Sequence, residues 1–296
     1  PLLLGGGVRL PTLHRTTMSL PDPAVLARAR AALVQLALEE DVGDGDWTTL
    51  WTVSPRRQSE AVIVAKQRLV VAGTHCVRDV FQALDPEVQV DIAVDDGAQA
   101  EDGRVLGRLR GSTRSLLVGE RTALNFLGRL SGIATLTRLF VDAVKGTGAR
   151  IIDTRKTTPG WRLLEKAAVR AGGGANHRVG LHDMVLVKDN HADACGGVAQ
   201  ATQAALENND RGLLVEVEVR TLDELEAVLP FGVHRVLLDN MSLDLLAKAV
   251  ARVRSWGPGR PEIEASGNVT YQAYFDVMAS ISAAAPPRLW PMVLMV

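Results

Sequence analysis

The sequence predicts an α/β protein of two domains, the second of which is a complete or incomplete parallel α/β barrel. Three observations lead to this fold class. The 296 residues suffice for two domains, at about 150 residues per domain. The first half has several strand-like runs around one helix, which indicates an α+β layer with a mostly antiparallel sheet. The second half alternates short apolar runs with helical segments, which is typical of βαβ units and a parallel sheet.

In the first half, a helix is expected over residues 23–40, where apolar side chains recur at helical spacing and Pro23 suits the first turn. The following segment, EDVGDGDWTT, is expected to be a turn-rich loop. The remaining elements of this half are a helix over 74–85 and strands over 59–66, 68–73, 88–97 and 103–111.

A long helical stretch over residues 114–145 leads into the second half, and Ser131 with Gly132 predicts a break in it. The strands expected after it are 151–153, 183–187, 213–219, 234–239 and 261–265. The helices between them are expected over 160–171, 197–207, 221–229 and 242–254. A doubly wound open sheet is the alternative to a barrel. It is less favoured because the chain has no G-x-G-x-x-G after a strand and no G-x-x-x-x-G-K-[ST].

Composition excludes several classes of protein. The chain is 47% hydrophobic and 23% charged, so it can bury a core. Its net charge of −1 argues against a nucleic-acid footprint over the whole surface, since such domains are usually basic. No apolar run is long enough to span a membrane. Cys76 and Cys195 are far apart, which predicts packing residues without a disulfide in a reducing, cytoplasmic compartment.

The two ends of the chain differ from the rest in composition. Residues 1–17 contain three consecutive glycines and no acid, so they are expected to be a disordered leader, with Met18 as the natural start. The expected domains are 18–129 and 130–270. Residues 271–296 form an atypical tail that contains Pro286, Pro287 and a bare apolar end.

Polar residues end each strand of the second half, and in a parallel barrel the carboxyl ends of the strands carry the active site. Loops often begin with charged residues, but five consecutive strand ends of this kind favour a ring around one mouth. The residues at or just after these strand ends are Arg155, Lys156, Lys188, Glu218, Asp239, Ser266 and Gly267.

Further basic residues extend this candidate pocket. His177 and Arg178 follow three glycines, which let backbone amides approach an anion, although the run could be only a mobile loop. Arg121 lies on the long helical stretch, where a solvated face is the ordinary alternative. Six cationic side chains would then meet only Glu218 and Asp239. Such a pocket suits a ligand with phosphates or carboxylates, and its two carboxylates suit a divalent metal or ribose hydroxyls. A helix start after Ser266 and Gly267 would seat a phosphate.

Several of these segments together resemble the quinolinate phosphoribosyltransferase family, also called nicotinate-nucleotide pyrophosphorylase (carboxylating). The matching segments, over roughly residues 24–270, are EDVGDGDWTT, GERTALNFLGRLSGIAT, DTRKTTPGWRLLEKAAVRAGGGANHRVGLHDMVLVKDNH, VEVEV, VLLDN and EASG. The resemblance implies an N-terminal α/β sandwich domain, an incomplete α/β barrel, and a homodimer. It implies that quinolinate and phosphoribosyl pyrophosphate, with Mg²⁺, give nicotinate mononucleotide, pyrophosphate and carbon dioxide in de novo NAD biosynthesis.

The resemblance also implies roles for the pocket residues. Arg121 would reach quinolinate from the partner subunit of the dimer. The two carboxylates of quinolinate would be held by Arg155, His177 and Arg178. The phosphoribosyl and pyrophosphate groups would meet Lys156 and Lys188, which are candidate catalytic residues together with Glu218 and Asp239. Glu218 and Asp239 would bind ribose hydroxyls and the metal, and the 5′-phosphate would be held by Ser266 and Gly267.

The chain departs from the family pattern at its end. Asn268 and Val269 stand where the family usually has Gly–Ile, and the family's last strand and phosphate-binding segment are not found. In the family the last residues return to the first domain. We therefore expect a shift of reading frame or an altered terminus near residue 270, and a barrel that lacks one strand.

Three other functions stay open. The chain could be a molybdenum-transport-associated paralogue, although such relatives are expected to lose the dicarboxylate-binding set. It could be a non-catalytic protein that binds phosphorylated ligands, inactivated by its tail. It could be an unrelated barrel lyase or aldolase that forms a Schiff base at Lys156 or Lys188, which borohydride trapping would reveal.

Overall fold

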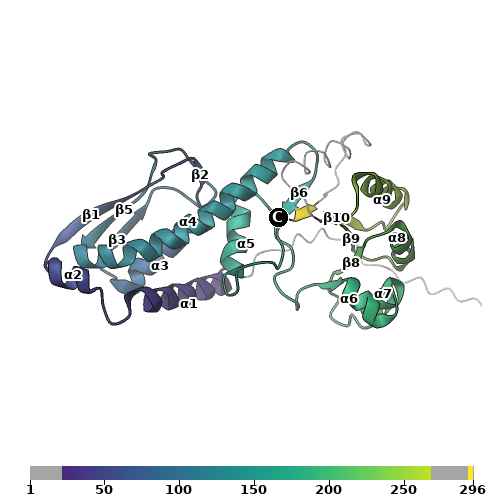
Figure 1. Ribbon diagram of the computed structural model, residues 1–296, viewed down its shortest axis with the longest axis horizontal. Helices are drawn as coiled ribbons and strands as arrows, with labels where there is room; N and C mark the ends of the chain where they lie inside the picture. The colour runs from purple at the N-terminus through teal and green to yellow at the C-terminus, as the bar shows by residue number, and fades with distance from the viewer. Residues whose placement is uncertain (1–21, 268–292, 296) are drawn as a thin grey trace, which may run out of the picture.

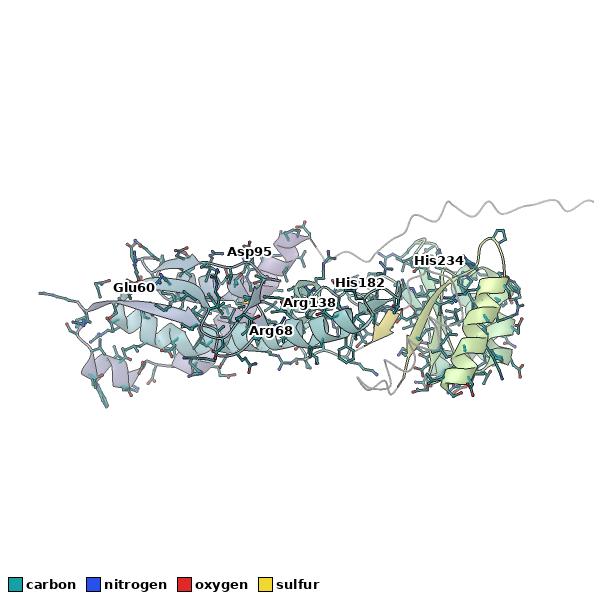
Figure 2. All side chains as sticks on the ribbon, turned by 90° about the horizontal axis from the view of Figure 1, so that it is seen from above. Glu60, Arg68, Asp95, Arg138, His182 and His234 are labelled. Atoms are coloured by element: carbon teal, nitrogen blue, oxygen red, sulfur yellow. The ribbon has the colours of Figure 1, made fainter. Side chains whose placement is uncertain are left out.

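A computed structural model of the protein describes residues 22–267 and 293–295. Figure 1 shows two domains arranged along the longest axis, with one long helix running from the first into the second. In the view from above, Glu60 lies in the first domain and His234 in the second (Figure 2). None of the described helices combines the length and the apolar character needed to cross a bilayer.

The first domain is an α/β sandwich, as predicted. Its antiparallel sheet has the order β1-β5-β3, and two short strands pair beside it. The strands are β1 (Gln58–Val64), β2 (Leu69–Val70), β3 (Gln89–Ile92), β4 (Gln99–Ala100) and β5 (Val105–Ser112). Alternation in β5 buries Leu109 under the helices, while Arg108 and Arg110 face outward and pair with Glu60. Leu106 is also buried, next to the irregularity where the register between β1 and β5 shifts.

The helices of the first domain are α1 (Pro23–Val42), α2 (Trp47–Thr52), α3 (Thr74–Leu84) and α4 (Thr113–Ala143). Helix α2 lies within the segment expected to be only a loop. It begins there because the Asp46 side chain accepts a hydrogen bond from the Thr49 backbone and caps the helix.

Helix α4 runs for 31 residues without a break, so the predicted interruption at Ser131 and Gly132 is wrong. The reason is tertiary: the Ser131 hydroxyl is buried and exchanges hydrogen bonds with the backbone of Ala72. The helix also serves both cores. Phe126 packs in the first domain, and Phe140 packs in the second.

The second domain contains a sheet of six parallel strands in the order β6-β11-β10-β9-β8-β7. The strands are β6 (Arg150–Ile152), β7 (Val185–Val187), β8 (Val215–Val219), β9 (Arg235–Asp239), β10 (Glu262–Ser266) and β11 (Val293–Met295). Neighbours follow chain order and the last strand pairs with the first, which is barrel winding and excludes the doubly wound alternative. No ladder joins β6 to β7 among the described residues, so the barrel is incomplete.

The helices of this domain are α5 (Arg162–Ala171), α6 (Asp189–Cys195), α7 (Val198–Glu207), α8 (Leu222–Val228) and α9 (Leu243–Ser255), with a 3-10 turn over Leu229–Phe231. Helices α7, α8 and α9 cover the outside of the strands (Figure 1). Helix α5 instead packs Leu164 and Ala168 into the core of the first domain. The expected boundary between residues 129 and 130 therefore falls inside the shared helix α4.

The tail corrects one expectation. Strand β11 pairs with β10 on one side and β6 on the other, so a strand fills the position expected to be missing. This strand belongs to the sheet of the second domain and does not return to the first. The predicted leader, residues 1–17, and the rest of the predicted tail lie outside the described residues.

Candidate active site

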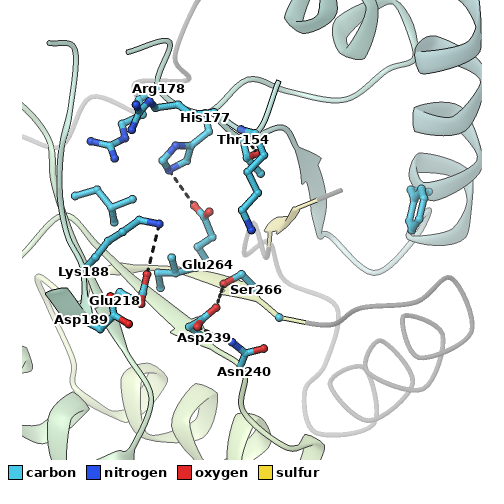
Figure 3. A pocket seen from close by; sticks show the side chains of 16 residues that line it. Thr154, His177, Arg178, Lys188, Asp189, Glu218, Asp239, Asn240, Glu264 and Ser266 are labelled. Carbon is cyan, nitrogen blue, oxygen red and sulfur yellow. Dashed lines mark hydrogen bonds and ion pairs between the residues drawn. The ribbon is translucent and has the colours of Figure 1, made fainter. Parts of the chain in front are cut away.

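A cavity of about 860 Å³ opens at the carboxyl ends of the barrel strands (Figure 3). Of the predicted site residues, the following line it: Arg155, Lys156, His177, Arg178, Lys188, Glu218, Asp239, Ser266 and Gly267. Thr154, Asp189 and Asn240, which stand next to predicted site residues at the strand ends, also line the cavity. So do Glu264 and Phe140, which were not predicted. A signal for Glu264 did exist, because an acidic residue inside an apolar parallel strand is unusual.

Arg121 is the exception among the predicted residues. It is exposed on α4, in the part of the helix that packs on the first domain, and it does not line the cavity of its own chain. Its expected approach to the site from a partner subunit stays a prediction.

One wall of the cavity is lined by cationic side chains that have few hydrogen-bond or ion-pair partners. Arg178 is buried, and its Nη1 donates to the carbonyl of Met184 at 3.1 Å. Burial and the neighbouring charge of Arg155 lower the pKa of Arg178. The Nε of Arg155 is buried without a hydrogen-bond partner among the described residues, and no carboxylate among them forms an ion pair with Arg155 or Lys156. Cations left unpaired at a cavity wall are suited to an anionic ligand.

His177 is held at its backbone by a buried cluster. Its N–H donates to Asp153 Oδ1 at 2.8 Å, and its carbonyl accepts from Lys166 Nζ at 3.0 Å. Lys166 also pairs with Asp153, while Asn176 donates to the other oxygen of that carboxylate at 2.6 Å. Lys166 is fully buried at 0% exposure. These contacts fix the backbone of the loop that carries His177 and Arg178.

The His177 ring points to two buried carboxylates. Its Nε2 lies 2.8 Å from Glu216 Oε2 and 3.5 Å from Glu264 Oε2. Arg235 Nη1 lies 3.5 Å from Glu216 and 3.1 Å from Glu264. Burial, together with the charge of Glu216, raises the pKa of Glu264 well above its usual value. Burial alone would raise the pKa of Glu216, but the hydrogen bond and charge of His177 outweigh it and lower that pKa.

The opposite wall carries two carboxylates. Lys188 Nζ lies 3.9 Å from Glu218 Oε2 (Figure 3). Burial and the negative charge of Asp239 raise the pKa of Glu218. Asp239 accepts hydrogen bonds from the Ser266 hydroxyl and, at 2.8 Å, from Asn240 Nδ2. Two oriented carboxylates that repel each other are the donor set that a hard cation or a pair of hydroxyls would satisfy.

The glycines divide into two kinds. Gly267 has a φ of +145°, and a Cβ there would lie 2.9 Å from Asn240 Oδ1, so the backbone reaches the cavity only because no side chain is present. Gly172 instead lies against α4, where a Cβ would meet the Ala134 carbonyl oxygen at 2.5 Å. The glycine run at 172–174 thus permits close packing between helices, and the expectation that it cradles an anion is wrong. The helix expected after Gly267 lies outside the described residues.

These features define a class of protein. An incomplete α/β barrel has a mouth in which cations converge on one side and two carboxylates stand on the other. Such a site can hold a multiply anionic substrate beside a sugar or a metal ion, as enzymes that act on phosphorylated sugars require.

Comparison with known proteins identifies the family. Residues 46–131 match the family Quinolinate phosphoribosyl transferase, N-terminal domain, and residues 133–281 match its C-terminal domain. The chain therefore belongs to the quinolinate phosphoribosyltransferase family, as its motifs predicted.

Individual relatives agree. The chain is 42% identical to the "Probable nicotinate-nucleotide pyrophosphorylase (carboxylating)" of Synechocystis, over 86% of each chain. It is 41% identical to quinolinate phosphoribosyltransferase (decarboxylating) 1b of Nicotiana tabacum, over 83% of this chain and 74% of that protein. The solved nicotinate-nucleotide pyrophosphorylase of Francisella tularensis superposes with a TM-score of 0.81 at 32% identity, covering 90% of each chain.

Proposed function

We propose that this protein transfers the phosphoribosyl group of phosphoribosyl pyrophosphate to the ring nitrogen of quinolinate. The products are nicotinate mononucleotide, pyrophosphate and carbon dioxide, in the de novo synthesis of NAD. The observation that carries this function is the convergence of Arg155, Lys156, His177 and Arg178 on one wall of a cavity whose other wall holds Glu218 and Asp239.

The cationic wall suits the two carboxylates of quinolinate. Arginine presents a planar fork that matches a carboxylate, so Arg155 and Arg178 would fix the ring in register, and His177 would contribute a third contact. Lys156 and Lys188 would neutralise the phosphates. This wall lies opposite the carboxylates, so a bound pyridine nitrogen would face the sugar that they hold.

The chemistry follows from charge. When the bond between the anomeric carbon and pyrophosphate breaks, its electrons leave with pyrophosphate and positive charge develops on the ribose, next to Glu218 and Asp239. The pyridine nitrogen then bonds to that carbon and becomes cationic. The bond to the 2-carboxylate can now break: carbon dioxide leaves, its electron pair stays on the ring carbon, and a proton is taken up there. No covalent bond to the protein is needed.

We further propose that Mg²⁺ binds at Glu218 and Asp239 together with the substrate. The fit rests on the raised pKa of Glu218, which reflects burial and a repulsion from Asp239 that the charge of Lys188 offsets only in part and that a divalent cation would remove. When bound, the ion supplies charge that stabilises the leaving pyrophosphate. Asp239→Asn should weaken Mg²⁺-dependent binding of phosphoribosyl pyrophosphate while leaving quinolinate binding within about twofold.

We also propose that the protein works as a homodimer in which Arg121 reaches the quinolinate site of the partner subunit. Its support is the exposure of Arg121 outside the cavity of its own chain. Mixing Arg121→Ala with Lys188→Ala protein tests this arrangement: two inactive variants should recover activity through mixed dimers. No recovery, with mixed dimers shown by mass, would refute it.

We place the enzyme in the cytoplasm on the support of two free cysteines, Cys76 and Cys195. The names of some plant relatives give other subcellular locations, for example chloroplastic in Arabidopsis thaliana and mitochondrial in Nicotiana glauca. Fractionation of the source cells would settle the matter, and enzyme found in a membrane-bound compartment would overturn this assignment.

The decisive test is turnover. Purified protein with quinolinate, phosphoribosyl pyrophosphate and Mg²⁺ should release nicotinate mononucleotide and carbon dioxide in equal amounts. Arg155→Ala and Lys188→Ala should each lower kcat/KM by about 100-fold. Lys248→Ala, which removes an exposed lysine from the outer helix α9, is the matched control and should leave the rate unchanged.

Two alternatives predict other outcomes. A non-catalytic homologue would bind quinolinate without releasing carbon dioxide, and a molybdenum-transport-associated paralogue would not bind it. Neither is favoured, because all three cavity residues expected to hold the carboxylates are present, as is the family match over both domains. A Schiff-base lyase has no support in the comparisons.

A further inference from the structure

We infer that Glu216, Glu264 and Arg235 are positioning residues for His177: from inside the barrel they fix the ring so that only its Nδ1 edge meets a bound carboxylate. This inference rests on the proposed function for the identity of that carboxylate, which would belong to quinolinate. The orientation itself can be tested without any substrate.

Three adjacent strands build the cluster. Glu216 lies on β8, Arg235 on β9 and Glu264 on β10, and the ladder places Glu216 directly beside Arg235. Glu216 and Glu264 are both 0% exposed, and His177 is 5% exposed. Of this group, His177 and Glu264 line the cavity (Figure 3). Glu216 and Arg235 do not line it, and they contact His177 and Glu264 from behind the cavity wall.

The cluster engages one ring nitrogen and leaves the other for a ligand. Nε2 faces both carboxylates, at 2.8 Å from Glu216 and 3.5 Å from Glu264. No hydrogen bond joins Nδ1 to any residue in the described part of the chain. The backbone of His177 is also held, by Asp153 and Lys166. With Nε2 donating to a carboxylate, a ring that carries both protons donates its second proton from Nδ1 to an anion in the cavity.

The same three side chains resemble a metal site, since ligand atoms of His177, Glu216 and Glu264 lie within 4.8 Å of one another. Arg235, however, already supplies the positive charge there. Its guanidinium lies 3.1 Å from Glu264, 3.5 Å from Glu216 and 3.1 Å from Glu262. Arg235 therefore supplies the positive charge that a metal ion would otherwise bring to the two glutamates. Its guanidinium also holds both of them next to the His177 ring.

Stability alone does not account for this arrangement. Glu216 Oε1 and Glu264 Oε1 are buried without hydrogen-bond partners among the described residues. Buried ion clusters of this kind are often no more stable than well-packed apolar side chains, while they do impose one geometry. The cluster therefore leaves some of its hydrogen-bonding capacity unused, yet it contacts a residue of the cavity wall. The orientation that it gives to His177 explains why it is there.

The test compares two identical substitutions on either side of Arg235. Glu216→Gln removes the charge that faces His177, whereas Glu262→Gln removes a half-exposed charge that pairs with Arg235 but not with His177. In the intact protein, Glu216→Gln should raise the Kd of quinolinate by about tenfold. Glu262→Gln should leave it within about twofold, and neither change should alter the affinity for phosphoribosyl pyrophosphate by more than that.

A double-mutant cycle separates positioning from general damage. In a His177→Ala background, Glu216→Gln should cause no further loss of quinolinate affinity, because the residue it orients is gone. An additional tenfold loss in that background, or an equal loss in Glu262→Gln, would overturn the inference. Arg235→Lys, which keeps the charge but not the fork, should give an intermediate loss and guards against a fold defect peculiar to one variant.

Nitrogen NMR of ¹⁵N-histidine-labelled protein tests the orientation without substrate. The His177 signals, assigned by their loss in His177→Ala, should show a protonated Nε2 in the wild type, and this pattern should change in Glu216→Gln but not in Glu262→Gln. A deprotonated Nε2 in the wild type would overturn the inference. If the wild type shows the expected pattern but binds no quinolinate, the proposed function fails and the positioning of His177 stands.

Discussion

The two domains differ in the polar groups that they bury. In the described part of the first domain, the buried polar side chains are hydroxyls, such as those of Thr49, Thr74 and Thr122. The barrel domain buries ionisable groups as well. The buried ionisable residues are Asp153, Glu165, Lys166, His177, Arg178, Glu216 and Glu264.

This difference separates a scaffold from a site. Burying a charge is unfavourable unless it is paired and hydrogen-bonded, so a domain selected for stability alone would avoid it. The first domain follows that rule. In the barrel, the buried charges other than Glu165 surround one loop, which carries His177 and Arg178, and they lead to the cavity wall. We conclude that the barrel keeps these charges to position its cationic wall.

The largest effect is expected where a buried charge supports both stability and the site. Lys166→Met leaves Asp153 buried without its ion-pair partner and should lower the free energy of unfolding by about 3–5 kcal/mol. It should also weaken quinolinate binding, because the His177 carbonyl loses its donor. Denaturant unfolding measures the change in stability, and titration calorimetry measures the change in quinolinate affinity. A stability loss with unchanged quinolinate affinity would show that this cluster is only structural.

An apolar substitution in the first domain should affect stability alone. Phe81 is buried under α4, where Gly119 leaves room for its ring. Phe81→Ala should lower the free energy of unfolding by about 3 kcal/mol or more through cavity formation. At low temperature, where the variant is still folded, its Kd for quinolinate should equal that of the wild type. A changed Kd would contradict the separation between scaffold and site.

Some features of these regions could be predicted from the sequence, and others depend on tertiary contacts. The apolar periodicity located the barrel strands, and the polar strand ends predicted Lys188, Glu218 and Asp239 at one cavity, where the structure places them. The sequence did not reveal the Glu216–Arg235–Glu264 cluster, because a strand pattern says nothing of which neighbour a buried charge meets. Nor could it show that α4 continues through Gly132, since that depends on the tertiary contact of Ser131 with Ala72.

Glu165 is expected to be the structural exception among the buried charges. Burial would raise its pKa, but hydrogen bonds from Arg129 and Thr158 outweigh burial and lower it. A lowered pKa means that Glu165 stabilises the fold above its unfolded pKa, and that this stabilisation is lost as pH falls through the folded value. Glu165→Gln should cost about 1–2 kcal/mol at neutral pH, and progressively less in acid. A difference that stays constant with pH would contradict this role.

The smallest effect is expected from the cysteines. Burial raises the pKa of the Cys76 thiol to about 12, as expected of a packing residue, whereas Cys195 is exposed, so the prediction that it packs in a core is wrong. A thiol reagent should therefore modify Cys195 alone in the native protein, with no loss of turnover, and should reach Cys76 only after unfolding. Cys195→Ser protein provides the control. Rapid native labelling of that variant would show that the first domain opens readily and is not the rigid scaffold described above.

The most direct test of the central claim compares a dianion with a monoanion. Isothermal titration of the wild-type protein with quinolinate and with nicotinate, which has one carboxylate fewer, measures how much the cationic wall contributes. We predict that quinolinate binds at least about tenfold more tightly, and that Arg155→Ala removes most of this preference. Equal affinities, or a preference that survives in Arg155→Ala, would contradict the assignment of this wall to the substrate carboxylates.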